Sequence, residues 1–153
     1  MKTQQLQTET GNRQFSTFYV QDLFFGIEVL EVQEVLRYQE MTKVPLAPDL
    51  IEGLINLRGQ IVTAIDMRRR LRLEPRKAGE TPMNMVVRGD DGAVSLLVDE
   101  IGDVLEVRND IYEPPPENTP RELREMIAGV YKLDGRLLLV LDTERVLQSQ
   151  PVN

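Results

Sequence analysis

The side chains of this sequence that could carry chemistry are carboxylates and guanidiniums, because the chain contains no histidine and no cysteine. It therefore lacks the commonest general base near neutral pH, the usual thiol nucleophile and the commonest metal ligand. Two adjacent acidic pairs remain, Asp90-Asp91 and Asp99-Glu100. Neighbouring strand residues face opposite sides, so we do not expect Asp99 and Glu100 to form a catalytic dyad. We predict no catalytic residue, no metal site, no cofactor and no enzymatic activity. A carboxylate-dependent enzyme is kept as an alternative, since paired carboxylates can do chemistry where two acids converge in a deep cleft.

Guanidiniums are concentrated in the run RRRLR at residues 68–72, which Arg76 and Lys77 follow. A small β-barrel with such a run could bind nucleic acid, and we keep this as the alternative function. The run contains no aromatic residue for base stacking, and the net charge of −7 arises entirely in residues 77–153. An acidic half repels phosphate, so a solvated linker or a protein-docking patch is favoured over a nucleic-acid site.

Arg58 is set apart by a repeat within the chain. EGLINLRGQIVTAID at residues 52–66 is echoed by AGVYKLDGRLLLVLD at residues 128–142, and aligning residues 51–71 with 127–147 gives seven identities in 21 positions. Arg58 aligns with Asp134, so the repeated fold does not require a cation there. The planar fork of donors of an arginine suits a partner carboxylate or carbonyl. The alternative is a local salt bridge to Asp66 or Glu52.

The elements that position these residues are mainly short strands joined by tight turns. Hairpins are predicted over residues 14–30, 54–66, 83–101 and 130–142, with turns at Arg58-Gly59, Asp91-Gly92 and Asp134-Gly135. Residues 32–36 fit either a helical turn or an irregular strand. Brief helices are expected at 48–53, ended by Gly53, at 119–129 and at 143–148. The second of these would begin with a Thr119, Pro120 and Glu122 capping box and end at Gly129.

Two sequence units of about five strands each have too many edges for one open sheet, which favours closed barrels. We predict a mainly β fold of two five-stranded barrels packed side by side, with short helices and a shared apolar interface. Residues 1–13 form a flexible tail, the first barrel spans about 14–76, the second about 80–142 with strand exchange possible, and 143–153 form a C-terminal helix and tail. No signal peptide or membrane-span pattern is present, so a cytoplasmic protein without membrane insertion is expected.

The stretches FGIEVLEVQEVL, IEGLINLRGQIVTAIDMRRRL and VSLLVDEIGDVLEV, in this order, resemble the CheW family of bacterial chemotaxis adaptors. The resemblance covers about residues 14–148, and NLRG is its most specific part. It implies two SH3-like barrels in a non-enzymatic scaffold that couples the cytoplasmic tip of methyl-accepting chemotaxis receptors to the regulatory domain of the histidine kinase CheA. The isolated chain is expected to be monomeric. A chemosensory pathway with a non-flagellar output is an alternative setting.

The resemblance also implies site residues. The expected receptor-binding set is Val32, Glu34, Gly53, Leu57, Arg58, Ile101 and Val104. Ile111 and Tyr112 are candidates for docking the kinase. For Val32, Ile101 and Val104 the competing interpretation is an ordinary core position, and for Gly53 it is a helix stop. Ser95 departs from the family pattern, because relatives often carry glycine at that place.

Overall fold

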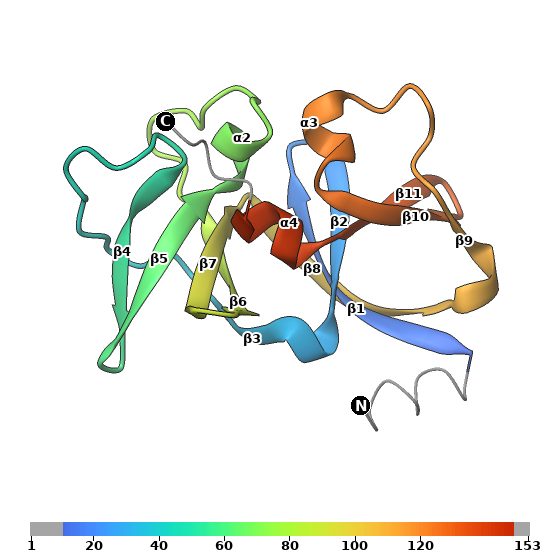
Figure 1. Ribbon diagram of the computed structural model, residues 1–153, viewed down its shortest axis with the longest axis horizontal. Helices are drawn as coiled ribbons and strands as arrows, with labels where there is room; N and C mark the ends of the chain where they lie inside the picture. Colours follow the sequence, from blue (N-terminus) through green and yellow to red (C-terminus); the bar gives the residue numbers. More distant parts are fainter. Residues whose placement is uncertain (1–10, 149–153) are drawn as a thin grey trace.

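The computed structural model describes residues 11–148, which form two sheets and several short helices (Figure 1). The strands are β1 (Asn12–Val20), β2 (Leu23–Glu28), β3 (Val32–Leu36), β4 (Ile51–Leu57), β5 (Gln60–Asp66), β6 (Met83–Gly89), β7 (Gly92–Val98), β8 (Glu100–Arg108), β9 (Tyr112–Glu113), β10 (Ile127–Leu133) and β11 (Arg136–Leu141). The helices are η1 (Val29–Glu31), α2 (Met67–Arg70), η2 (Asn109–Ile111), α3 (Arg121–Arg124) and α4 (Thr143–Gln148). The predicted mainly β fold with short helices is confirmed.

The two sheets do not follow the two halves of the sequence. A five-stranded sheet has the order β3-β6-β7-β5-β4, and a six-stranded sheet has the order β8-β1-β2-β11-β10-β9. We call these the five-stranded lobe and the six-stranded lobe. The barrels expected from residues 14–76 and 80–142 therefore exchange strands, because the chain changes lobes after β2 and again after β7. Asn12 and Arg13, expected in the flexible tail, already belong to β1; the rest of that tail, apart from Gly11, and residues 149–153 lie outside the described residues.

The strand registers confirm the sequence repeat. In the β4–β5 hairpin Ile51 pairs with Ile65 and the register shifts before Gly53, and the β10–β11 hairpin shows the same shift between Ile127 and Gly129. Each hairpin then adds a parallel strand of the other sequence half, β7 beside β5 and β2 beside β11. The lobes are thus two copies of one topology, related by equivalent positions such as Arg58 and Asp134.

Two glycines predicted to end helices lie inside strands instead. A Cβ on Gly53 in β4 would lie 2.8 Å from the backbone oxygen of Thr42, which forms a bridge to Leu54. At the equivalent Gly129 in β10 a Cβ would meet the ring of Tyr112, 2.4 Å away. The predictions were wrong because these glycines make room for a chain segment that crosses the strand, a long-range demand that local helix-ending rules do not contain.

The predicted capping box is also absent. Helix α3 begins at Arg121 with Pro120 at its N-cap, and no side chain caps it. The Thr119 hydroxyl donates a 2.6 Å hydrogen bond to the Pro116 carbonyl. The hydroxyl is thus used by the proline-rich turn before the helix. Residues 32–36, for which the sequence left two possibilities, form strand β3 after the single turn of η1.

The lobes are joined by a shared apolar core, as predicted from their small size. Phe25 and Ile27 of the six-stranded lobe pack in one cluster with Leu96 and Val98 of the five-stranded lobe. Residues on the opposite strand faces form a second core within each lobe; Leu97, for example, lies in that of the five-stranded lobe. Because these strands are buried on both faces, their sequences are nearly continuous apolar runs.

An ion-pair network lies where the chain passes from one lobe to the other for the second time, between β7 and β8. The Asp99 carboxylate accepts a 2.8 Å hydrogen bond from Arg68 and lies 3.2 Å from a nitrogen of Arg76, which also binds Asp66 at 2.9 Å. Burial raises the pKa of the Asp99 carboxyl, but hydrogen bonds from the Arg68 guanidinium and the Gln21 backbone N–H outweigh it and bring that pKa below its ordinary value.

Asp99→Asn should lower the free energy of unfolding by about 2 kcal/mol at pH 7, because it removes an ionic acceptor from two largely buried guanidiniums. The folded-state pKa lies below the unfolded-state value of about 3.9, so ionised Asp99 stabilises the fold above about pH 4. That contribution is lost as the pH falls through the lower folded-state pKa. Urea unfolding should therefore show a difference in the free energy of unfolding between wild type and variant, and this difference should narrow below about pH 4.

Asp22→Asn, at an exposed turn position, is the control and should change the free energy of unfolding by less than about 0.5 kcal/mol. A pH-independent difference would contradict the assignment.

Gly53→Ala should destabilise the protein by about 2 kcal/mol, because the new methyl group meets backbone atoms that cannot rotate away. The matched variant Gly129→Ala should cost less, since the three atoms nearest its methyl group belong to the side chain of Tyr112, which is 37% exposed, and not to the backbone. Thermal and urea unfolding of both variants compares them directly. An equal or greater loss of stability in Gly129→Ala would contradict this explanation, in which a clash with the backbone at Gly53 costs more than a clash with a side chain at Gly129.

Candidate protein-binding site

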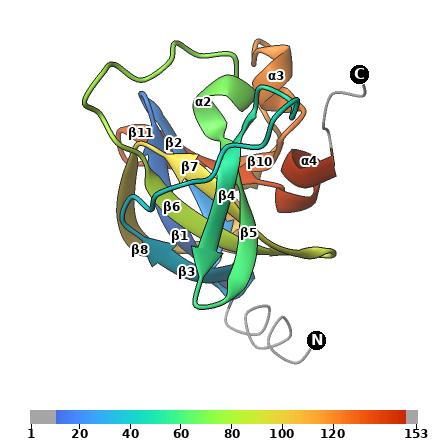
Figure 2. The same ribbon diagram turned by 90° about the vertical axis from the view of Figure 1, so that its left-hand side faces the viewer.

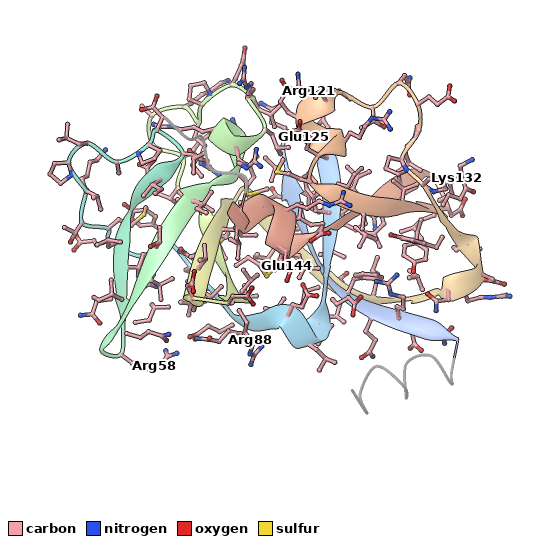
Figure 3. All side chains as sticks on the ribbon, viewed as in Figure 1. Arg58, Arg88, Arg121, Glu125, Lys132 and Glu144 are labelled. Carbon is pink, nitrogen blue, oxygen red and sulfur yellow. The ribbon has the colours of Figure 1, made fainter. Side chains whose placement is uncertain are left out.

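Arg58 lies at the tip of the β4–β5 hairpin (Figure 3), at one end of the five-stranded lobe (Figure 2). The turn places Arg58 at φ 52° and Gly59 at φ 91°, with the Gly59 N–H donating to the Asn56 side-chain oxygen at 2.9 Å. A left-handed backbone favours Asn, Asp or Gly over Arg, so the turn itself does not call for this residue. The Arg58 side chain is 70% exposed. Its repeat counterpart Asp134 does not share the left-handed conformation.

The guanidinium of Arg58 forms an ion pair with Glu34 of β3. The salt bridge is therefore made to another candidate residue, and not to Asp66 or Glu52 as the alternative proposed. A pair this exposed contributes little to stability, because solvent screens it. It does hold the guanidinium over β3, where Val32 packs partly buried against the shared core.

Strand β3 is fixed at its start by Arg88 of β6. The Arg88 guanidinium donates 3.0 Å hydrogen bonds to the backbone oxygens of Leu30 and Val32. The β3–β6 ladder then shifts register between Val32 and Glu34, which is where a bulge re-aims side chains. The structure thus brings Val32, Glu34 and Arg58 together from two elements of one lobe.

Two other predicted contact residues are interior positions. Leu57 is 6% exposed and packs in the apolar core of the five-stranded lobe, and Gly53 is buried against the Thr42 backbone. Neither presents a side chain at the surface, and the expected receptor contacts of both stay predictions. They position the β4–β5 hairpin that carries Arg58.

Ile101 and Val104 lie on β8, in the other lobe. By the repeat, Ile101 is the equivalent of Val32, and both pack partly buried against the shared core. Val104 is 60% exposed, and its equivalent Val35 on β3 is exposed as well. Sequence reasoning missed Val35, although the repeat that aligns GIEVLEVQEVL with SLLVDEIGDVL pairs these two valines. Exposed apolar positions therefore occur on both strands that follow the lobe crossings.

Ile111 and Tyr112 lie on η2 and β9, at the end of the six-stranded lobe remote from the β4–β5 turn (Figure 1). Both are a little over one-third exposed. The Tyr112 ring packs on Tyr131 at 5.0 Å between centroids and beside the Arg13 guanidinium at 5.4 Å, so part of its role is structural. Ile111 has no such role in the described part of the chain.

The arginine run is largely neutralised by the chain itself. Arg68 and Arg76 bind Asp99 and Asp66. Arg69 lies near Glu52 and Asp66, and Arg72 near Glu122. Burial lowers the pKa of Arg70, the Nε and one terminal nitrogen of which have no hydrogen-bond partner within residues 11–148. Since Arg68, Arg69, Arg72 and Arg76 already face carboxylates and Arg70 is partly buried, these cations do not form an open phosphate-binding stripe.

Asp99, which precedes Glu100 in one of the two acidic pairs, forms ion pairs with Arg68 and Arg76. Within the described residues, acidic side chains form no group of three or more that could hold a metal ion. In the same part of the chain no helix is long and apolar enough to cross a membrane. The geometry is that of a surface for binding other proteins, with exposed apolar side chains beside a charged pair.

Comparison with known proteins agrees with this assignment. The family model of the CheW-like domain matches residues 14–151. The chain is 32% identical to a chemotaxis protein CheW of Klebsiella aerogenes over 93% of this chain and 86% of that protein. It is 30% identical to the chemotaxis protein CheW of Bacillus subtilis over 93% and 90% of the two chains.

Among solved structures, the scaffolding protein TtCheW from Thermoanaerobacter tengcongensis superposes with a TM-score of 0.81 at 26% identity. The superposition covers 89% of this chain and 92% of that one. The interleaved two-lobe fold, the NLRG turn and the match over nearly the whole sequence lead to the same conclusion: this chain belongs to the CheW family.

Proposed function

We propose that this protein is a chemotaxis adaptor that couples the cytoplasmic tip of a methyl-accepting chemotaxis receptor to the regulatory domain of the histidine kinase CheA, without catalysis of its own. The observation that carries the proposal is the CheW-like domain over residues 14–151. Relatives that are chemotaxis proteins and a structural neighbour described as a scaffolding protein support it.

The receptor surface in this proposal is built around the Arg58–Glu34 pair. The exposed guanidinium keeps donors free for a receptor carboxylate or carbonyl, while Glu34 holds it in place. Val32, Ile101 and Val104 supply apolar contact area from the two lobes. A left-handed arginine where Asn or Asp would suit the backbone better is typical of a residue retained for binding.

Kinase docking is assigned to the opposite end of the molecule, around Ile111 and Tyr112. Separate surfaces allow both partners to bind at once, and each partner then raises the effective concentration of the other. A scaffold needs no more than this to assemble a signalling complex. A pathway with a non-flagellar output would use the same two surfaces with other receptors and another kinase.

The nucleic-acid alternative is not favoured. It depended on the arginine run, and four of those side chains face carboxylates of the same chain. The acidic second half adds electrostatic repulsion.

Arg58→Asp should weaken binding to a receptor cytoplasmic fragment at least about tenfold, because it replaces the donor fork with a carboxylate beside Glu34. The fold should be retained, since Asp tolerates the left-handed turn better than Arg does. Isothermal titration calorimetry measures the affinity, and thermal melting checks the fold. Asp134→Arg, the reverse change at the equivalent turn, is the control and should leave receptor binding unchanged. Loss of folding in Arg58→Asp would make this arginine structural.

Ile111→Glu should weaken binding to the isolated regulatory domain of CheA several-fold and leave receptor binding unchanged, because it places a charge in the assigned kinase surface. Leu46→Glu, a fully exposed apolar position in the five-stranded lobe, is the matched control. Gel filtration should show a ternary complex of wild-type protein, kinase and receptor fragment. Unaltered kinase binding by Ile111→Glu would move the docking surface elsewhere.

A further inference from the structure

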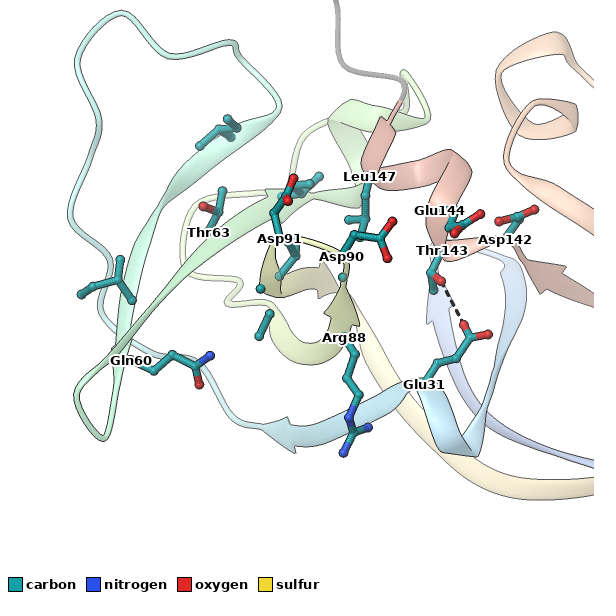
Figure 4. A pocket seen from close by; sticks show the side chains of 17 residues that line it. Glu31, Gln60, Thr63, Arg88, Asp90, Asp91, Asp142, Thr143, Glu144 and Leu147 are labelled. Atoms are coloured by element: carbon teal, nitrogen blue, oxygen red, sulfur yellow. Dashed lines mark hydrogen bonds between the residues drawn. The ribbon is translucent and has the colours of Figure 1, made fainter. Parts of the chain in front are cut away.

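A groove of about 810 Å³ lies in the seam between the two lobes (Figure 4), beside the Arg58 turn, since Gln60 and Ile61 of its lining follow that turn directly. One wall comes from β5 and the β6–β7 turn of the five-stranded lobe, and the other from η1 and α4. Its apolar lining includes Ile61, which is 59% exposed, together with Ile65, Val94 and Leu147. An open groove with exposed aliphatic side chains is suited to bind the apolar face of a partner segment.

The rim of the groove is acidic. Its lining includes one guanidinium, Arg88, and five carboxylates, namely Glu31, Asp90, Asp91, Asp142 and Glu144. The Arg88 guanidinium donates to backbone oxygens of the η1–β3 segment. Asp142 lies 3.3 Å from Arg145, whereas the other four carboxylates form no ion pair with a described residue. The groove therefore carries negative charge that the described chain leaves uncompensated.

Glu31 shows the effect of that charge most clearly. Burial raises the pKa of its carboxyl, the hydrogen bond from the Thr143 hydroxyl at 2.9 Å opposes the rise, and the carboxylates of Glu28, Asp142 and Glu144 add to it. A partly buried carboxylate among other carboxylates is stabilised by any cation that enters beside it.

The repeat shows which cation fits. The equivalent groove, between β1–β2 and α2, has a volume of about 400 Å³ and is lined by Arg68 and Arg76 beside Asp99. There the two guanidiniums bind carboxylates of the same chain. At the position equivalent to Arg68 the acidic groove has Glu144. The acidic groove therefore has the Glu144 carboxylate at the place where the Arg68 guanidinium lines the equivalent groove.

Neither the chain ends outside the described residues nor the basic run of a second copy offers a cluster of exposed, unpaired cations. The segments outside the described residues, MKTQQLQTET and SQPVN, contain one basic side chain, Lys2. In the basic run of a second copy, Arg68, Arg69, Arg72 and Arg76 already face carboxylates of their own chain. A metal ion is disfavoured because the carboxylates do not converge into a metal-binding group in the described structure, and nucleic acid would be repelled.

We propose that this acidic groove, defined by Glu31, Asp91, Glu144, Ile61 and Leu147, is a docking site for an amphipathic basic segment of a partner protein. An arginine or lysine of the segment enters beside Glu31 and Glu144, and aliphatic side chains cover Ile61 and Leu147. Charge on the groove speeds association and the apolar lining provides contact area. Arg58 does not line the groove, which begins at Gln60 of the same hairpin, so the groove gives the adaptor a third binding surface next to the receptor surface.

Fluorescence anisotropy of the full chain tests the proposal with a labelled synthetic peptide of about twelve residues, which carries arginines beside leucines on one helical face. Matched peptides have the arginines replaced by glutamates or the leucines by serines. We expect saturable binding of the first peptide, weaker at higher salt, at least tenfold weaker binding of the serine peptide, and no binding of the glutamate peptide. No saturable binding of the arginine–leucine peptide up to about 1 mM, or equal binding of the serine peptide, would overturn the proposal.

Two charge reversals locate the site. Asp91→Lys and Glu144→Lys should each weaken peptide binding at least tenfold, whereas Asp22→Lys, the same change at the turn equivalent to Asp91, should weaken it less than twofold. Equal losses in all three variants would indicate non-specific attraction and overturn the proposal. Circular dichroism melting verifies the fold of each variant, and either groove variant alone suffices for the comparison.

Two further measurements separate this site from the receptor surface and from self-association. Arg58→Asp should bind the peptide normally, and Glu144→Lys should bind the receptor fragment normally. A negative result for one proposed site therefore does not contradict the other. Sedimentation velocity should show no dimer at micromolar concentrations. A dimer abolished by Glu144→Lys would put a second copy in the groove and overturn the proposal.

Discussion

The need of two very small sheets to bury both of their faces governs this structure. A sheet of five short strands has too little interior to be stable alone, so each lobe places one strand face in its own core and the other against its neighbour. The shared core contains side chains such as Phe25 and Leu96 from opposite lobes. Because the chain changes lobes after β2 and after β7, neither half of the sequence can complete a lobe by itself. The two lobes are therefore expected to unfold as one unit.

The strands that follow the two changes of lobe carry exposed apolar and charged side chains. Strands β3 and β8 occupy equivalent edge positions in the two sheets, and each presents a valine to solvent, Val35 and Val104. The turn beside β3 adds Arg58 and its pair with Glu34. A binding surface at this place uses strands that cannot move independently, since both are anchored in the shared core. That rigidity lowers the entropic cost of holding a partner.

Duplication followed by divergence accounts for the remaining differences. The same topology carries Arg68 in one seam groove and Glu144 in the equivalent one, which changes an internally neutralised site into an acidic, open one. Arg58 and Asp134 differ in a similar way at the two hairpin tips. Substitutions of this kind are tolerated because the backbone is held by buried apolar residues, and exposed charges contribute little to its stability.

Sequence reasoning was most successful where local rules and periodicity coincide. The four hairpins, the glycine turns of three of them and the terminal helix were predicted from alternation and turn chemistry. The repeat also predicted two equivalent bodies, and their small size predicted a shared apolar interface between them. The helix ends assigned to Gly53 and Gly129 were wrong, because in both cases the glycine accommodates a distant segment. Leu57 was assigned to the surface for a similar reason, since its place in a lobe core depends on strands far away in the sequence.

The sequence by itself determined the duplicated hairpins, the β class, the absence of histidine and cysteine chemistry, and the asymmetry between Arg58 and Asp134, since all of these are local or compositional properties. Only the tertiary structure decided which strands share a sheet, that Arg58 pairs with Glu34, and that the seam groove holds uncompensated carboxylates. The physical reason is that strand exchange and charge pairing depend on which residues far apart in the chain become neighbours. One-dimensional patterns of hydrophobicity and turns do not specify that choice.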